Sequence, residues 1–218
     1  MTTFPRSPRL LKGGIVLIDP DTSAVQRIIS LQYNPEKLTR TLKGSTVGED
    51  SDRSQALRLK GAPVETYKLD VVIDAADQLE FPDKNEEVKE YGIAPLLCAL
   101  EVIVYPESSQ LLANNSLAAS GTLEILPTEA PLTLFIWSKN RVLPVRLTDF
   151  SITEEAFDPN LNPIRAKVSL GMRVLSVNDL GFDHKGGSLY MAYQQKKEQL
   201  ATKFKQGTLS TLGVGEIS

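Results

Sequence analysis

The sequence predicts a mainly β (β+α) protein: an antiparallel β-barrel or sandwich with one inserted helix and a second helix near the C-terminus. The strongest observation is the stretch Pro163–Val174, where apolar side chains occupy every even position from Ile164 onward and polar or small ones the odd positions. Strand side chains alternate between faces, so this pattern predicts a long strand with one dry and one wet face. Further alternating runs are joined by Pro, Asn and Gly turns, which is typical of antiparallel sheets.

The partner of this strand lies directly upstream. Apolar side chains alternate from Leu143 to Leu147, and the phase then shifts to Phe150 and Ile152. A one-residue phase shift inside a strand is what a β-bulge produces. Residues 154–163 are acidic and rich in Pro and Asn, which favours a structured connection. Residues 140–177 are therefore predicted to form one long antiparallel hairpin.

The N-terminal third predicts an arm, a hairpin and a third strand. Residues 1–12 are basic and punctuated by proline, so we expect an extended arm. Residues 14–18 and 25–33 read as two strands around an Asp-Pro-Asp-Thr turn. Asn34-Pro35 ends the second strand, and residues 38–42 alternate again. The polar residues 43–63 follow as a loop longer than about 12–15 residues, a length that is usually functional or disordered.

The middle of the chain predicts a clean strand and then the inserted helix. Residues 64–73 alternate strictly, and residues 74–85 are polar, so we expect a strand followed by a loop. Residues 86–105 carry a helical apolar stripe. Gly92 and Pro95 argue against one unbroken helix, and Pro95 suits the first turn of a second helical piece. Residues 107–120 read as a linker.

The C-terminal part predicts two more strands, the long hairpin and a final helix. The strands are expected at residues 122–126 and 132–137. After Gly181, Gly186 and Gly187, residues 188–204 read as a helix, and residues 206–218 as a mobile tail. The expected organisation is an arm over 1–12, a β-barrel domain over 13–180, and a helix with a flexible tail over 181–218.

Charge, apolar segment length and cysteine count limit the classes of function that the chain can have. The 24 basic and 27 acidic residues nearly balance, so nothing draws the chain to nucleic acid. No segment approaches the roughly 18 consecutive apolar residues of a membrane helix, and the N-terminus lacks a secretory pattern. Cys98 stands alone in an apolar run, which fits a reducing compartment and predicts a buried structural thiol. We expect a protein that is cytoplasmic as synthesised and not inserted in a membrane.

Motifs for chemistry are sparse. His184 is the one histidine, flanked by glycines, and is expected to be a solvated loop residue rather than a catalytic base. One Cys and one His cannot build the usual zinc sites, and the Asp pairs do not continue into a calcium loop. Glu154 and Glu155 are adjacent and point to opposite faces of a strand, so they favour a solvated loop or an interface salt bridge over a proton-sharing dyad. No catalytic, metal or cofactor site is expected, and no enzyme.

Several stretches carry a resemblance to a known family. They are residues 4–13, 32–36 and 74–80, and the long run 130–166 with its turn Asp158-Pro159-Asn160-Leu161-Asn162-Pro163 followed by Ile164-Arg165-Ala166. Together they resemble the tube-related baseplate proteins of contractile injection systems, the phage-tail-like particles of bacteria, over most of residues 4–180. The chain departs from some relatives after Leu180, where they carry a LysM-type module and this sequence has a helix and a tail.

The resemblance implies a fold similar to the phage tail-tube subunit, with one helix packed outside a β-barrel. It implies hexameric rings whose sheets join around a central channel, and a position as adaptor or tube initiator between the spike or hub of the baseplate and the inner tube. A major inner-tube or phage tail protein is the first alternative. A small-ligand barrel using His184 or the acids near Glu154 is the second.

Candidate subunit-interface residues follow from these expectations. The corner 33–36 and the tip of the long hairpin would each reach a neighbouring subunit or ring, although both also suit plain turns. Two tyrosines of the last helix are included, with anchoring of that helix on its own barrel as the alternative. The candidates are Tyr33, Asn34, Pro35, Glu36, Phe157, Asp158, Pro159, Asn162, Tyr190 and Tyr193.

Overall fold

Seven strands form one antiparallel sheet in the order β2-β1-β5-β6-β7-β4-β3, which confirms the mainly β prediction. The structure is a computed structural model and describes residues 10–45, 58–120, 130–215 and 217. The predicted strand over 122–126, most of the arm, and residues 46–57 of the long loop lie outside these ranges. The strands are β1 (Gly14–Ile18), β2 (Val25–Ser30), β3 (Leu38–Lys43), β4 (Val64–Asp74), β5 (Leu132–Ser138), β6 (Arg141–Phe157) and β7 (Pro163–Val174).

The long hairpin is β6 and β7, and its bulge is confirmed. The register shifts between Leu147 and Asp149, after which Phe150 pairs with Leu170. The even positions of β7 from 166 to 174 are buried, as the alternation predicts. The connection is shorter than predicted, because β6 continues to Phe157 and only residues 158–162 turn. Glu154 and Glu155 therefore lie on a strand and not in a loop.

The first hairpin and the corner after it are also confirmed. The Asp19 carboxylate accepts hydrogen bonds from the backbone N–H groups of Asp21 and Thr22, which closes the turn between β1 and β2. β2 ends at Ser30, a little before the predicted residue 33. β2 and β3 are the two ends of the seven-strand order, so each pairs with one strand of the described sheet.

Between β4 and β5 the chain forms more helix than predicted. The expected break is confirmed: α2 (Glu86–Tyr91) ends at Gly92, and α3 (Ala94–Glu101) carries Pro95 in its first turn. The expected loop over 74–85 is wrong, because it contains α1 (Ala76–Leu79) and η2 (Pro82–Lys84). The expected linker over 107–120 is wrong as well, because it forms α4 (Ser108–Ala119), whose residues show no apolar periodicity.

Gly92 explains how this insertion meets the hairpin. Its φ is +60°, and a Cβ there would lie 2.1 Å from the carbonyl oxygen of Pro163. Ile93 donates its N–H to the same carbonyl at 2.8 Å. A side chain at position 92 would separate the helices from the hairpin, so the glycine permits the close approach.

The C-terminal part consists of α5 (Val177–Leu180), α6 (Lys185–Ala201) and η3 (Leu209–Leu212). Helix α6 begins at Lys185 and not after the glycines as predicted, so Gly186 and Gly187 lie inside its first turn. A Cβ on Gly187 would lie 1.8 Å from the Gly181 carbonyl oxygen, so the glycine lets α6 pack directly under the end of α5. The C-terminal tail, which was expected to be mobile, contains the short helix η3.

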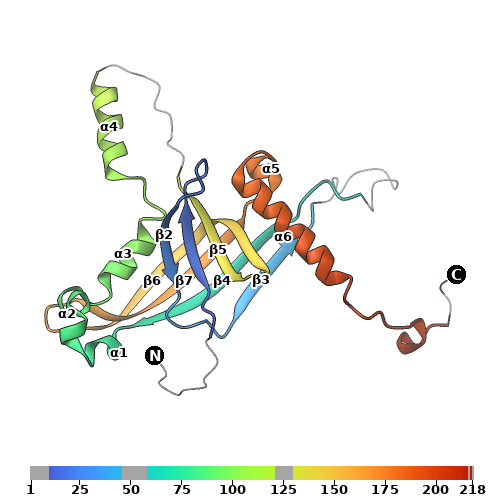
Figure 1. The fold of residues 1–218 in the computed structure, drawn as a ribbon, viewed down its shortest axis with the longest axis horizontal. Helices are drawn as coiled ribbons and strands as arrows, with labels where there is room; N and C mark the ends of the chain where they lie inside the picture. Colours follow the sequence, from blue (N-terminus) through green and yellow to red (C-terminus); the bar gives the residue numbers. More distant parts are fainter. Residues whose placement is uncertain (1–9, 46–57, 121–129, 216, 218) are drawn as a thin grey trace.

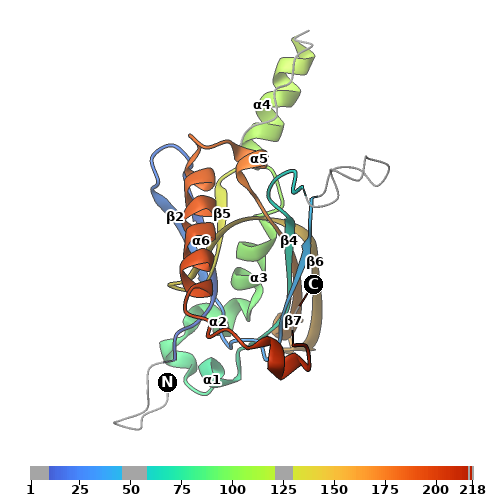
Figure 2. The ribbon, with the colours of Figure 1, turned by 90° about the vertical axis from the view of Figure 1, so that its right-hand side faces the viewer.

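The core lies on the concave side of the curved sheet. In Figure 1 the strands cross the centre of the molecule, with α1–α3 at one end and α6 leading away at the other. Figure 2 shows α3 between the limb that carries β2 and β5 and the limb that carries β4, β6 and β7, and α6 overlapping β2 and β5 in this view. One cluster joins residues from both limbs and both helices, among them Ile15, Tyr67, Leu97, Phe135, Leu143, Val168, Met172, Tyr190 and Tyr193.

Cys98 lies outside the core and Trp137 lies at its margin. Cys98 is exposed, contrary to the prediction, because Leu97 and Leu100 occupy the buried face of α3 and Cys98 points elsewhere. Trp137 is partly buried and packs against the core. None of the helices in the described part is long and apolar enough to cross a bilayer.

Candidate assembly surfaces

The two edge strands are the first candidate surface. Nearly all residues of β2 and β3 are exposed or half-buried, with Ile29 as the buried exception. An edge strand presents unpaired N–H and C=O groups that can template pairing with another chain. The exposed side chains include Arg27 and Ile28 on β2 and Arg40 and Leu42 on β3. Both edges are therefore chemically able to accept a strand from a neighbour.

The predicted corner lies at the end of β2 and ties three segments together. Asn34 accepts a hydrogen bond from the N–H of Gly13 at 2.9 Å, and its amide donates to the carbonyl of Leu11 at 2.8 Å. Gln32 bonds the backbone of Asp74 in both directions, at 2.6 and 2.8 Å. Asn34 thus has a defined role in shaping the corner.

The other corner residues are available at the surface. Tyr33 and Glu36 are exposed and Pro35 is half-buried. Partial burial, followed by the charges of Asp77 and Asp74, raises the pKa of Tyr33. The side chain of Tyr33 therefore lies close to the carboxylates of Asp77 and Asp74. An intersubunit role for the corner stays a prediction.

The hairpin tip is held rigid by Asp158. Its carboxylate accepts hydrogen bonds from the N–H of Asn160 at 2.7 Å, the N–H of Asn162 at 2.8 Å and the Asn162 amide at 2.9 Å. The Asn162 side chain first, and the backbone bonds after it, hold the pKa of Asp158 below its usual range. Asn162 also donates to the carbonyl of Glu90 at 2.9 Å, which ties the tip to α2.

This rigid tip displays apolar surface. Phe157 and Leu161 are exposed, and Leu161 adopts a positive φ of 67° that turns the chain. Pro159 is also exposed, whereas Asp158 and Asn162 are half-buried in the network that supports them. A fixed, partly apolar tip at one end of the molecule suits a contact with another protein, and that contact stays a prediction.

Tyr190 and Tyr193 lie inside the chain's own core, each 4% exposed. The hydroxyl of Tyr193 donates to Glu65 at 2.8 Å and lies 3.1 Å from the hydroxyl of Tyr67, which itself donates to Glu65 at 2.9 Å. The structure thus gives the two tyrosines the anchoring role that stood as the alternative to a surface contact. Whether they also affect a neighbouring subunit stays untested.

Glu65 is the centre of this network. It is 1% exposed, and Lys197 of α6 lies 3.5 Å away while Arg40 of the edge strand lies 3.9 Å away. A buried carboxylate requires charged and hydrogen-bonding partners, and α6 supplies two of them. Sequence reasoning missed this site. The signal was present, because Glu65 continues the apolar face of Tyr67, Leu69 and Val71 on β4.

The convex face of β4, β6 and β7 carries a different surface of paired polar side chains. Asp70 accepts a hydrogen bond from Ser169 at 2.6 Å and pairs with Lys167 at 3.5 Å. The Ser169 bond, followed by the Lys167 charge, lowers the pKa of Asp70. Arg165 pairs with Glu155 at 3.1 Å. This face is therefore hydrophilic, and its charges are largely matched within the chain.

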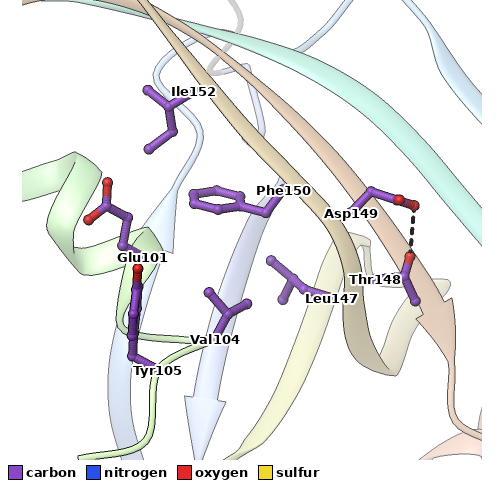
Figure 3. Close-up of a pocket in the computed structure, with 8 residues that line it drawn as sticks. All are labelled: Glu101, Val104, Tyr105, Leu147, Thr148, Asp149, Phe150 and Ile152. Atoms are coloured by element: carbon purple, nitrogen blue, oxygen red, sulfur yellow. Dashed lines mark hydrogen bonds between the residues drawn. The ribbon is translucent and has the colours of Figure 1, made fainter. Parts of the chain in front are cut away.

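A groove of about 580 Å³ lies between the end of α3 and the bulge of β6. Figure 3 shows Leu147, Phe150 and Ile152 facing Val104 and Tyr105 across it, with Glu101 at its side. Thr148 and Asp149 project away from these residues, and the Thr148 hydroxyl donates to the Asp149 carboxylate at 3.1 Å. The groove is thus a mostly apolar strip with the carboxylates of Glu101 and Asp149 at its margins.

His184 does not lie in a solvated loop as predicted. It is half-buried and caps α6, with its Nδ1 accepting a hydrogen bond from the N–H of Gly186 at 3.0 Å. This hydrogen bond gives the residue a structural task at the start of the helix. Within the described ranges, His, Cys, Asp and Glu side chains form no group of three that could hold a metal ion.

Comparison with solved structures finds seven chains that match this one. No protein-family model matches the chain, and no curated protein matches it. The chain is similar to a solved structure described as the tail of an empty GTA particle with C6 symmetry, at 13% identity over 75% of this chain and 90% of that chain. The TM-score is 0.28, which does not establish a common fold.

Proposed function

We propose that this chain is a structural protein of a phage-tail-like contractile injection particle, and that it forms a hexameric ring connecting the inner tube to the spike or hub of the baseplate. The family resemblance of residues 4–180 supplies this expectation. The physical observation that carries it is the seven-stranded sheet that ends in two exposed strands, β2 and β3. A ring of identical chains requires two different patches on each copy, and two unlike edges meet that requirement.

Edge pairing explains how the sheets of neighbours would join. β2 of one copy pairs with β3 of the next through backbone hydrogen bonds, which continues the sheet around the ring. Each copy then buries both of its edges, and the ring closes without leaving a free strand. The same pairing in an open geometry would produce a filament, so the twist of the sheet must set the closure.

The two faces of the sheet have different tasks in this arrangement. The concave face is covered by α3 and α6 and holds the core, whereas the convex face of β4, β6 and β7 is bare and polar. A water-filled channel requires polar, hydrogen-bonded walls. We assign the convex face to the channel and the helices to the outside of the ring.

The partners are other copies of the chain, the inner-tube protein and the spike or hub protein. The hairpin tip and the corner 33–36 supply contacts outside the sheet edges. The protein acts without catalysis or cofactor, and it reaches the particle from the cytoplasm where it is made. The nearest alternative to the adaptor position is an inner-tube protein of the same architecture.

The test is the assembly state of the purified protein, alone and with the candidate tube and hub proteins, by solution mass and negative-stain imaging. Rings of about six copies support the proposal. Proline at Thr41 and, separately, at Leu42 probes the β3 edge, because neighbouring residues of an edge strand direct their N–H groups to opposite sides. The variant whose N–H faces outward is expected to fold and lose rings. A chain that stays monomeric and unbound with both partners overturns the proposal.

A small-ligand site is the second candidate, and the groove beside α3 is the observation that favours it. Its volume lies within the roughly 300–1,000 Å³ of ligand pockets. Replacing Phe150 by Ala there would abolish binding of a small apolar ligand, and would leave ring assembly intact. Saturable binding to the wild-type monomer that is lost in this variant would favour the ligand-binding reading.

A further inference from the structure

One end of the molecule combines exposed apolar side chains with a strongly acidic surround. The apolar end patch consists of Phe81 and Tyr91 from the helical insertion and Phe157 and Leu161 from the hairpin tip, all exposed. The hydrogen bond from Asn162 to the carbonyl of Glu90 holds the two parts together. Residues 74–90 around it contain seven acidic and two basic residues, so a partner for this patch must be apolar and positively charged.

The opposite end of the same chain has those properties. Residues 196–205, the last part of α6 and the turn after it, contain four basic residues and one acidic residue. Leu200 and Phe204 are exposed between them. Lys197 pairs with Glu65, whereas Lys196, Lys203 and Lys205 form no ion pair within the part of the chain that the structure describes. We name residues 196–205 the basic end.

The two ends are placed for contact between copies and not within one chain. Figure 1 is drawn with the longest axis horizontal, and α1 and α2 lie at one end of that axis while the C-terminal end of α6 points to the other. Two different patches at opposite ends of identical chains form a heterologous contact that repeats in one direction. Such a contact builds a ring or a filament.

The sheet edges bring the same ends together. Gln32, just after edge strand β2, bonds the backbone of Asp74 at the start of the acidic segment. Lys197 of the basic end reaches Glu65, which pairs with Leu42 of edge strand β3. Six antiparallel steps separate β2 from β3 in the sheet, so the two edge strands run in the same direction. When β2 of one copy pairs in parallel with β3 of the next, the end of β2 beside Asp74 meets the end of β3 beside Glu65, and the basic end then lies next to the neighbour's acidic segment.

We infer that the basic end of one copy docks onto the apolar end patch of the next copy, where Lys196, Lys203 and Lys205 meet the acidic surround and Phe204 meets Phe81 and Tyr91. This contact rests on the proposed ring of copies and names a second element of its seam, beside the strand edges. It also gives the C-terminal helix a task in assembly.

Charge reversal tests the contact in the full-length chain. The first variant replaces Lys196, Lys203 and Lys205 by Glu and leaves Lys197 with its buried partner. The second replaces Glu80, Asp83 and Glu90 by Lys and spares Glu86 and Glu87, whose charges favour the N-terminus of α2. The matched control replaces the exposed Lys60, Lys139 and Lys185 by Glu, which changes the net charge by the same amount as the first variant. Sedimentation measures self-association at low and high salt.

Each reversal is expected to weaken self-association by about tenfold or more at low salt, with a smaller effect at high salt, where charges are screened. The control variant is expected to associate as the wild type does. Mixing the two reversed variants is expected to restore association, because each seam in an alternating assembly again joins opposite charges. Replacing Phe204 by Ser is expected to weaken association at both salt concentrations.

The outcomes separate this contact from the proposed function. If both reversed variants associate like the control, or if mixing them does not restore association, the end-to-end contact is wrong. The ring proposal still holds in that case if the proline variants of β3 abolish ring formation. If the wild-type chain alone is monomeric at low salt, the contact is wrong as well. The ring proposal is then decided by the mixture with the tube and hub proteins.

Discussion

The buried network around Glu65 gives the sharpest prediction for the folded chain. Replacing Tyr193 by Phe removes one hydroxyl and keeps the ring, so the packing of α6 against Tyr67 and the sheet is preserved. The lost hydroxyl donates to the Glu65 carboxylate at 2.8 Å and lies 3.1 Å from the Tyr67 hydroxyl. Glu65 then keeps Tyr67, Lys197 and Arg40 as partners, with one fewer charge-assisted hydrogen bond.

The expected loss follows from the charge of the acceptor. A hydrogen bond to a charged group contributes about 1.5–3 kcal/mol to the free energy of unfolding. For a chain of this size, 1 kcal/mol shifts the melting temperature by roughly 2–4 °C, so the variant is expected to melt about 3–12 °C lower. The double variant with Tyr67→Phe is expected to lose less than the sum of the two single changes, because the hydroxyls share one acceptor.

Thermal and chemical denaturation of the isolated chain measure this loss. Tyr190→Phe is the matched control: Tyr190 lies on the same helix and is equally buried, but no hydrogen bond of its hydroxyl is present among the described residues. The control is expected to change stability by less than Tyr193→Phe. Equal losses in the two variants, or additivity of Tyr193→Phe with Tyr67→Phe, would show that the network does not anchor α6.

Four further predictions address pH, packing, the hairpin tip and the thiol. Burial first, and the hydrogen bonds with Tyr67 and Glu65 after it, raise the pKa of Tyr193, so the folded chain keeps a proton that the unfolded chain loses above about pH 10. The contribution of Tyr193 to the free energy of unfolding is therefore present below about pH 10 and is lost as the pH rises further. In an alkaline denaturation series, the double variant with Tyr67→Phe and Tyr193→Phe should show a smaller loss of stability with rising pH than the wild type. Gly187→Ala would place a Cβ 1.8 Å from the Gly181 carbonyl oxygen and should lower the free energy of unfolding by about 1–3 kcal/mol, whereas Gly207→Ala, which meets nothing within 4 Å, should be close to neutral in the same urea titration. Asp158→Ala removes the acceptor of three hydrogen bonds, so amide exchange at Asn160 and Asn162 should quicken in NMR spectra while β7 stays protected; unchanged exchange at the tip contradicts the structure. Cys98 is exposed, so a thiol reagent should label it in the native protein at a rate near that of the denatured chain, and a protected thiol would restore the buried reading.

Where the sequence predicted the fold correctly, one physical constraint dominated. β7 must bury one face along its whole length, so its alternation cannot slip by a residue without exposing the core. The same constraint on β6 makes the bulge visible as the phase shift after Leu147. The break at Gly92 and the helix start at Pro95 are likewise local requirements of the backbone, and both were readable from residue type alone.

The sequence predictions were wrong or incomplete where no burial or backbone requirement shapes the local residue pattern. Among the described residues no side chain of α4 is buried, so its sequence needs no apolar stripe, and Leu111, Leu112 and Leu117 do not form one. Gly186 and Gly187 are poor helix formers, and they occupy the first turn of α6 because the end of α5 leaves no room for a side chain. Glu65 was not singled out within the predicted strand 64–73, since the partners that make its burial possible, Tyr193 and Lys197, lie about 130 residues away. Contacts of this range are not visible in local periodicity.

A sequence without any catalytic motif can still encode defined surfaces for assembly. An edge strand, a rigid hairpin tip and a charged helix end need no particular residue at a fixed spacing; they require only that the fold leave them uncovered and hold them still. Here Asp158 holds the tip, Asn34 and Gln32 hold the corner beside β2, and Glu65 holds α6 beside β3. Each of these polar side chains ties a surface used in the proposed ring to the sheet. Loss of any one of them should therefore disturb assembly before it unfolds the chain, and ring formation is the more sensitive measurement of whether these anchors act as inferred.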